Sequence, residues 1–215
     1  MLLIRLIYIL SPLIALLAGI YSYKYLDKKL KLLFYYAIVG FCTEFLIWFS
    51  LKLGVKNNTP GLHFYIMFEF LIWAAFYTSC LKGFIHKKYM LIVTITFIVY
   101  CIINTLFIQE LKSYPHTRMI EDLLIIFFAI LLYAKIMIEA KIENLFRSPL
   151  IWINTAVLLY FAGNFFHNVV FVYMLVVDQA FLKTTAIYIF GLFNFLYYCG
   201  IAAGFLLHRK SISSK

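Results

Sequence analysis

Charged residues are scarce in this chain. Asp, Glu, Lys and Arg make up 13% of it, against about 25% of a soluble domain. Hydrophobic residues make up 65%, and the mean hydropathy is +0.95. This composition predicts a membrane protein with short loops, and it leaves no room for a separate soluble domain among the 215 residues.

Acidic residues are the scarcer of the two charge types. Nine Asp and Glu face 19 Lys and Arg, which gives a formal net charge of +10. In a soluble protein this excess would indicate a nucleic-acid partner. In a membrane protein, basic residues instead mark cytoplasmic loops and contact anionic lipid headgroups. We therefore expect the lipid bilayer as a partner, and no nucleic acid.

Motifs for catalysis and for metal or cofactor binding are also missing. The sequence has no CxxC, no HExxH and no GxSxG, and the last apolar segment has no lysine for a retinal Schiff base. Cys42, Cys80, Cys101 and Cys199 all lie in apolar segments, where cysteine behaves as a small hydrophobic residue. We expect no metal and no cofactor, and the sequence favours a role other than catalysis.

Apolar runs of about 20 residues indicate membrane-spanning helices. Seven such runs are joined by short polar connections. We therefore expect an all-α polytopic membrane protein, one domain over residues 1–215, with sequential helices as antiparallel neighbours. The expected spans are residues 1–26, 32–51, 62–81, 89–108, 118–138, 150–175 and 186–207.

Several helix boundaries have their own signals. Thr117 is the expected N-cap of the fifth helix, and Ser148 with Pro149 the expected N-cap and first residue of the sixth. The segment 177–185 is expected to be a loop.

The basic residues divide unevenly between the two sides of the predicted bundle. The first apolar segment resembles a signal peptide, but a basic run follows it, so we expect an uncleaved helix with its N-terminus outside. Thirteen basic residues then lie inside and six outside, which predicts an inside C-terminus. The inside set is Lys24, Lys28, Lys29, Lys31, Lys82, Lys87, Lys88, Lys135, Lys141, Arg147, Arg209, Lys210 and Lys215, and the outside set is Arg5, Lys52, Lys56, Lys112, Arg118 and Lys183.

Short similarities between the two halves are compatible with an internal repeat. Residues 68–71 read FEFL and residues 193–196 read FNFL. Gly40 precedes Glu44 by four residues, as Gly163 precedes His167. A 3+1+3 parallel repeat and chance in a Phe-rich chain both explain these matches.

Polar residues inside the spans indicate where a site would lie, and the segment 150–175 carries an unusual number of them. Polar groups in hydrocarbon usually face the bundle interior or a wet cavity. With a rise of about 1.5 Å per residue, Glu44, Glu69, His167 and Asn194 all fall about 11–12 Å below the outer surface. The sequence therefore predicts an outward-facing polar pocket.

Other polar residues extend this predicted pocket. Asn168 falls at nearly the same depth and Asn164 about one turn deeper, whereas Glu121 lies near the rim with Asp122, Arg118 and His63. The candidate ligand-binding residues are Glu44, Glu69, His167, Asn168, Asn194, Asn164 and Glu121.

Two uses of these residues remain open. In the first, buried polar groups only link helices through hydrogen bonds, which is the simpler explanation for any single asparagine. In the second, they form a functional site, which is the expectation for the ionisable residues Glu44 and Glu69. The expected partner of Glu44 and Glu69 is His167, unless the two acids share a proton. A metal site made by these three residues has no supporting motif.

Small residues recur in the last span as Gly200-Ile201-Ala202-Ala203-Gly204, a GxxxG pattern. Such a pattern lets two helices approach closely. Packing within one chain is the first expectation, and a homodimer the second.

Three loose motifs connect the chain to other proteins. They are His63-Phe64-Tyr65-x-x-Phe68-Glu69, Ser113-Tyr114-x-x-x-Arg118, and Ser148-Pro149-x-x-Trp152-Ile153-Asn154 with Tyr160-Phe161. With them the chain resembles a family of small seven-helix membrane proteins of Bacteroidetes that has no assigned activity. Such proteins look similar to the seven-helix input modules of bacterial sensor kinases. The resemblance implies a bacterial inner membrane and a separate signalling partner or sensor kinase, and it assigns no ligand.

Three function classes follow from these expectations. The first is a ligand-sensing or signalling module with an outward-facing pocket. The second is a small proton-coupled transporter that uses Glu44 and Glu69 as protonatable groups. The third is an intramembrane enzyme that acts on lipid.

Overall fold

The computed structural model describes the backbone of residues 2–55, 57–140, 144–177 and 179–213. Side chains are described in these ranges except at residues 2–9, 51, 171–187 and 190. Over this part of the chain the fold is all-helical, with seven α-helices and no strand. Of the basic residues in the charge count, Lys56, Lys141 and Lys215 lie outside the described residues, as do the side chains of Arg5 and Lys183.

Each long apolar run forms a helix, which satisfies the backbone N–H and C=O groups of its interior within its own segment. The helices are α1 (Leu2–Ser22), α2 (Lys28–Lys52), α3 (Thr59–Cys80), α4 (Lys87–Ile103), α5 (Thr117–Glu139), α6 (Pro149–Val177) and α7 (Gln179–Ser213). A π-helical turn, η2 (Asn104–Ile108), continues α4, and short 3₁₀ turns η1 (Tyr23–Tyr25) and η3 (Leu145–Arg147) flank α2 and α6.

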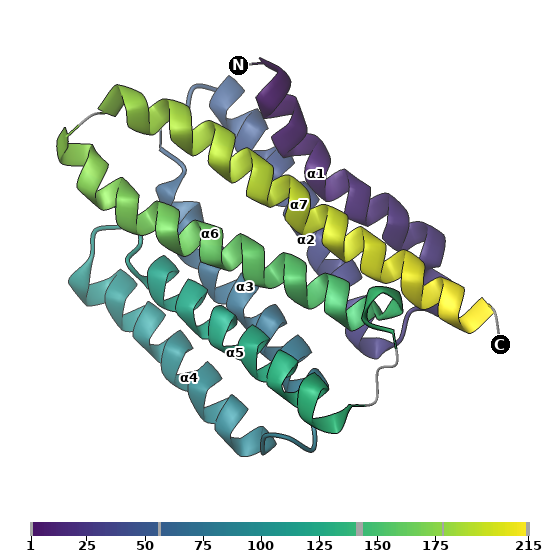
Figure 1. Cartoon of the computed structure of the whole chain (residues 1–215). Helices are drawn as coiled ribbons and strands as arrows, with labels where there is room; N and C mark the ends of the chain where they lie inside the picture. The colour runs from purple at the N-terminus through teal and green to yellow at the C-terminus, as the bar shows by residue number, and fades with distance from the viewer. Residues whose placement is uncertain (1, 56, 141–143, 178, 214–215) are drawn as a thin grey trace.

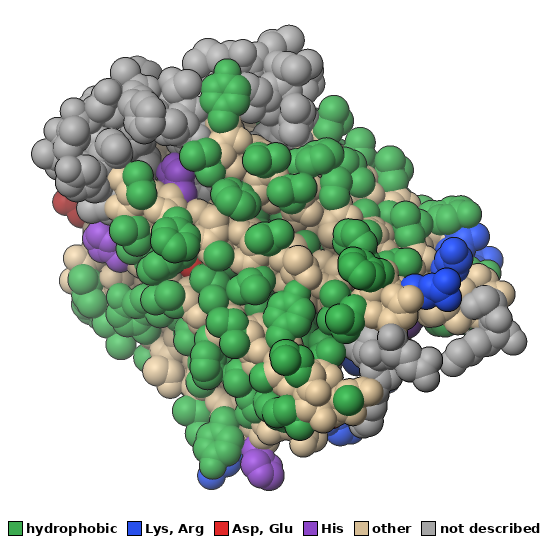
Figure 2. Space-filling model, viewed as in Figure 1, with side chains coloured by type: hydrophobic (Ala, Val, Ile, Leu, Met, Phe, Trp, Pro, Cys, Tyr) green, Lys and Arg blue, Asp and Glu red, His purple; other side chains and the backbone are tan. Residues whose placement is uncertain are grey.

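Five described helical segments are long and apolar enough to cross a membrane. They are Lys28–Ser50, Thr59–Cys80, Lys87–Ile108, Pro149–Val170 and Gly191–Ser213. The chain is therefore a membrane protein. The described surface agrees, because Figure 2 shows apolar side chains over the middle of one face and Lys and Arg side chains at its edges.

The helices lie side by side, and consecutive helices run in opposite directions (Figure 1). α1 packs against α2 and α7, α6 against α5 and α7, and α3 against α2, α4 and α5. The α2–α3 and α4–α5 connections lie at one end, here named the Pro115 end, and the α1–α2 and α3–α4 connections at the other, named the Lys82 end.

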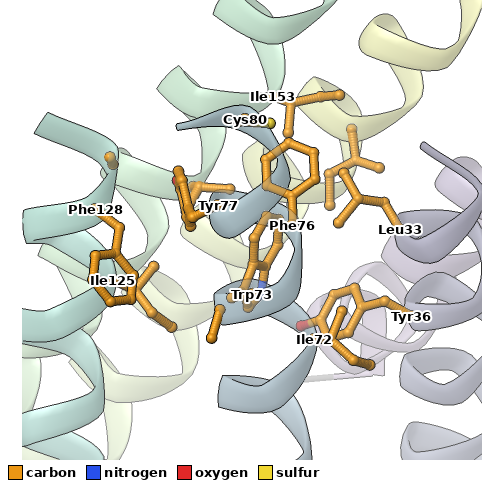
Figure 3. Close-up of a cluster of buried hydrophobic side chains, with 14 of the residues drawn as sticks. Leu33, Tyr36, Ile72, Trp73, Phe76, Tyr77, Cys80, Ile125, Phe128 and Ile153 are labelled. Atoms are coloured by element: carbon orange, nitrogen blue, oxygen red, sulfur yellow. The ribbon is translucent and has the colours of Figure 1, made fainter. Parts of the chain in front are cut away.

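The core follows α3. Trp73, Phe76 and Tyr77 of this helix are fully buried, and Figure 3 shows them between Tyr36 of α2 and Phe128 of α5. Replacing such an aromatic side chain by alanine typically costs about 3–5 kcal/mol. The aromatic core of the described bundle is therefore built on α3.

The GxxxG pattern serves packing within the chain, as expected. A Cβ atom at Gly200 would collide with Cβ of Ala156, and one at Gly204 would lie 2.5 Å from Cγ1 of Ile153. Both neighbours belong to α6, so the glycines let α6 and α7 approach closely.

The helix boundaries agree with the sequence in part. Pro149 begins α6, as predicted. Thr117 is the first residue of α5, and its predecessor His116 occupies the cap position without a side-chain cap hydrogen bond, so the Thr117 N-cap was wrong. The loop predicted over 177–185 was also wrong for residues 179–185, which are already part of α7.

Candidate functional site

Four charged side chains meet inside the bundle, here named the charge cluster: Glu69, Arg118, Glu121 and Asp122. Nη1 of Arg118 donates to Oε2 of Glu69 and, at 3.0 Å, to Oε2 of Glu121. Nε of Arg118 lies 3.6 Å from Oδ1 of Asp122. The three acids are 0% exposed and Arg118 is 6% exposed.

Helical spacing on α5 explains half of this arrangement. Residues three and four apart share one face of a helix, so Arg118 presents both Glu121 and Asp122 beside its own side chain. Glu121 and Asp122 are the fifth and sixth residues of α5, beyond its first turn, so Arg118 and not the helix dipole is their main source of positive charge. Glu69 reaches the same guanidinium from the middle of α3.

Tyrosine hydroxyls complete the environment of Glu69. Tyr36 of α2 and Tyr65 of α3 both donate to Oε1 of Glu69, the second at 3.4 Å. The two hydroxyls lie 3.3 Å apart. Glu69 therefore receives hydrogen bonds on one carboxylate oxygen and the ion pair on the other, which holds its orientation.

A second chain of hydrogen bonds leads from Asp122 towards the α4–α5 connection. Asn168 of α6 donates through Nδ2 to Oδ2 of Asp122 at 3.1 Å. Its Oδ1 accepts from the hydroxyl of Tyr114 at 3.0 Å. Burial raises the pKa of the Tyr114 hydroxyl to about 12, so this group is protonated at neutral pH and can donate.

The α4–α5 connection, residues 109–116, is fixed by further hydrogen bonds. Oε1 of Gln109 accepts from Nδ2 of Asn104 and from the backbone N–H of His116, each at 3.1 Å. Nε2 of buried His63 lies 3.1 Å from the carbonyl oxygen of Ser113. The segment follows a π-helical turn, a feature that often occurs at functional sites.

The charges of the cluster do not cancel. Among the described residues, Arg118 is the basic side chain in ion-pair distance of the three acids. With all four groups ionised, the formal charge of the cluster is −2. Unpaired buried charge is costly, so the surplus negative charge must be neutralised either by bound protons or by a further cation.

Two asparagines beside the cluster have unsatisfied amide atoms. Neither Nδ2 nor Oδ1 of Asn164 has a partner at good hydrogen-bond geometry, although its side chain interacts with the Tyr160 hydroxyl one turn before it, and Nδ2 of Asn194 has no partner either. Both side chains are at least 96% buried. A buried polar atom without a partner costs about 1–3 kcal/mol, so these atoms are not explained by links between helices.

The structure brings together most of the residues that the sequence singled out. Glu69 and Glu121 bind Arg118, Asn168 binds Asp122, and Asn164 lies on α6 one turn from Asn168. The partner of Glu69 is Arg118, and so the expectation of His167 or Glu44 as its partner was wrong.

One candidate, Glu44, stands apart from these interactions. No hydrogen bond or ion pair from the described residues reaches Glu44, which is partly buried in α2. The α2 residue that touches Glu69 is Tyr36, eight residues and about 12 Å before Glu44 along the helix. His167 is partly buried and interacts with the side chain of Asn168, which in turn binds Asp122.

Sequence reasoning placed Arg118 and Asp122 at the rim and gave Tyr36 no role. The signal for the first two was present, because an arginine followed at i+3 and i+4 by acids at a helix start predicts one charged face. Tyr36 carried no signal in a chain with 17 tyrosines. Among the described residues, no group of three or more His, Cys, Asp or Glu side chains is arranged to hold a metal ion.

The chain matches no protein family model, no curated protein and no solved structure.

Proposed function

We propose that the chain is an integral membrane sensing or signalling module that receives its input at the charge cluster. The observation that carries this proposal is the buried, unbalanced set formed by Glu69, Arg118, Glu121 and Asp122. Ionisable side chains inside a membrane bundle are costly, and their presence is best explained by function.

The proposed topology has seven spans, the N-terminus outside and the C-terminus inside a bacterial inner membrane. The charge asymmetry supports it, because the Lys82 end carries most of the basic residues and cytoplasmic loops are rich in Lys and Arg. The charge cluster then lies on the outer side and receives signals from outside the cell. Output passes at the Lys82 end to a separate signalling partner, such as a sensor kinase.

The packing towards the Lys82 end favours sensing over transport. There Trp73, Phe76, Tyr77 and Phe128 fill the space between the helices (Figure 3). The polar hydroxyl of Tyr77 already has a partner in the bundle, because it donates to Oδ1 of Asn154 at 2.9 Å. A ligand at the cluster therefore meets packed side chains and not a polar path.

A sensor must transmit a change at the cluster to its opposite end, which hydrogen–deuterium exchange can measure. Asp122→Asn removes one charge while keeping nearly the same shape, and Glu110→Gln is the matched control, an equal charge change at an exposed residue of the α4–α5 connection. We expect altered exchange at residues 81–86 in lipid nanodiscs for Asp122→Asn only. Unchanged exchange at these residues would refute the sensing proposal.

A proton-coupled transporter is the second candidate, favoured by the excess of carboxylates over arginine. It predicts that proteoliposomes with a trapped pH dye acidify when an inward proton gradient is imposed, and that Asp122→Asn abolishes the acidification. The sensing proposal predicts no acidification above that of protein-free liposomes.

A further inference from the structure

The unsatisfied amide of Asn164 faces the charge cluster. Asn164 lies on α6 three residues after Phe161, whose ring centroid is 5.7 Å from Cζ of Arg118. It lies four residues before Asn168, which binds Asp122. Residues at this spacing share one helix face, so Asn164 is directed towards the same interior as its two neighbours.

Asn194 lies at the same level on α7. The antiparallel register of α6 and α7 is fixed by Gly163, which packs on Phe193, and by Gly200, which packs on Ala156. Asn194 directly follows Phe193, which places it at the level of Gly163 and Asn164 along the two helices. Two buried amides with unsatisfied atoms thus lie at one level of the α6–α7 interface, and Asn164 is one turn from Asn168, which binds an acid of the charge cluster.

Aromatic rings enclose this region. Tyr197, one turn after Asn194 on α7, stacks on Tyr160 with 4.3 Å between ring centroids. It also lies 6.3 Å from the rings of Phe161 and Tyr36. Aromatic faces attract cations, so the walls and the surplus negative charge favour the same type of ligand.

The unsatisfied atoms restrict the ligand further. Oδ1 of Asp122 has Nε of Arg118 at 3.6 Å but no hydrogen bond, and Oε1 of Glu121 and Oδ1 of Asn164 have none either, so these oxygens can accept from further donors, whereas Nδ2 of Asn164 and Nδ2 of Asn194 can donate to an acceptor. Bound protons would neutralise the acids but leave the amide nitrogens without an acceptor. Water would satisfy the amides but leave the charge. A cation with both N–H donors and an oxygen atom meets the two requirements together.

We propose that Asp122, Asn164 and Asn194 form a binding site for a small protonated primary amine that carries an oxygen atom. The ammonium group lies against Asp122 and Oδ1 of Asn164, and the oxygen accepts from the two amide nitrogens. This site names the input of the proposed sensing module and so rests on that function. Such an amine is either free in solution or the headgroup of a lipid.

Ethanolamine is the probe for this site, and choline is its matched control. Choline carries the same charge and hydroxyl group but no N–H donor. In nanodiscs of phosphatidylcholine, which contain no primary amine, we expect ethanolamine hydrochloride to raise the melting temperature saturably, by about 3–6 °C at ten times Kd. Choline chloride at equal ionic strength should produce no such rise. An equal rise with choline, or none with ethanolamine, overturns the proposal.

Two leucine variants on α6 separate binding from folding. Asn164→Leu removes the unsatisfied amide and should weaken ethanolamine binding about tenfold or more. Asn154→Leu removes an amide that is hydrogen-bonded to Tyr77 and to the carbonyl of Ala129, ten residues away from the site. It should lower the melting temperature without ligand and retain the rise with ethanolamine. Wild-type affinity in folded Asn164→Leu contradicts the site.

A second preparation distinguishes the two sources of amine. Nanodiscs that contain phosphatidylethanolamine and no added amine should be stabilised if a lipid headgroup is the ligand, and not if it is a free amine. Failure of ethanolamine binding while Asp122→Asn still alters exchange at residues 81–86 refutes the ligand class and leaves the sensing function. Binding without any change there refutes sensing and leaves the site.

Discussion

Loss of the guanidinium in Arg118→Met tests whether the charge cluster is an ionic unit. In the wild type this one group faces Glu69, Glu121 and Asp122. Methionine fills part of the space with an apolar chain but leaves three buried carboxylates without a basic partner. The variant should therefore be less stable than the wild type.

The magnitude follows from the burial of the ion pairs that Arg118 forms. Removing one partner of a buried ion pair costs about 3–5 kcal/mol, because the other charge stays buried and unpaired. Arg118 is 6% exposed and its partners are fully buried, so solvent relieves little of this cost. We expect the free energy of unfolding to fall by at least about 3 kcal/mol.

Unfolding by SDS in dodecylmaltoside micelles, followed by tryptophan fluorescence, measures this decrease. Trp73 in the core reports on the packing around α3. Arg209→Met is the matched control, since Arg209 stacks on Tyr21 with 3.4 Å between Cζ and the ring centroid and has no acidic partner among the described residues. Its replacement should cost at most about 1 kcal/mol.

The double variant Arg118→Met/Glu69→Gln provides the decisive comparison. Glutamine at position 69 keeps an acceptor for the Tyr36 hydroxyl but no charge. Because it removes one unpaired carboxylate, the double variant should be more stable than Arg118→Met alone, by about 1–3 kcal/mol. A double variant that is less stable than the single one would refute the ionic interpretation.

Three further predictions concern the packing, the Lys82 end and the connection over the site. Gly200→Ala should lower the free energy of unfolding by about 1–3 kcal/mol, because the added Cβ collides with α6. Gly61→Ala, whose added Cβ meets nothing within 4 Å, should raise it by about 0.4–1 kcal/mol. SDS unfolding measures both changes. Lys135→Met removes two 2.8 Å hydrogen bonds, to the carbonyl oxygen of Cys80 at the end of α3 and to that of Lys82 just after it, together with a 3.7 Å ion pair with Glu139, and should cost about 1.5–3 kcal/mol. Exposed Lys88→Met should be nearly neutral, and equal destabilisation by both would contradict a capping role for Lys135. Tyr114→Phe removes the donor to α6 and should speed amide exchange of residues 109–116 about two- to tenfold; unchanged exchange would show that this hydrogen bond does not hold the connection.

The helices were predictable because membrane spans follow from length and hydrophobicity alone. Pro149 marked the start of α6, and the GxxxG pattern marked its close packing with α7. The end of α6 was not predictable in the same way. Residues 179–185 contain Gln179 and Lys183 and read as a loop, yet they continue a helix, because helix formation tolerates isolated polar residues when their backbone bonds stay intact.

The burial of the acids was predictable, but their partners were not. The depth calculation placed Glu69 well inside and Arg118 at the rim because it assumed that every helix begins at the same surface. Glu69 lies ten residues after Thr59, the start of α3, or about 15 Å along the helix, yet its partner is the second residue of α5. α5 therefore begins deeper in the bundle than α3, and the connection 109–116, with buried Pro115, folds in over it.

Glu44 was grouped with Glu69 because the calculation considered only depth along the helix. Depth along a helix says nothing about which way a side chain points, and α2 is mostly exposed around Glu44. A helix places successive turns on one face only at spacings near three, four or seven. Glu44 is eight residues from Tyr36, which turns it about 80° away from Tyr36 around the helix and places it about 12 Å along the axis. The polar layer around Glu69 is therefore completed from α2 by a tyrosine hydroxyl, which adds no charge. The surplus negative charge then comes from α3 and α5 alone, where a single arginine faces one acid from α3 and two from its own helix.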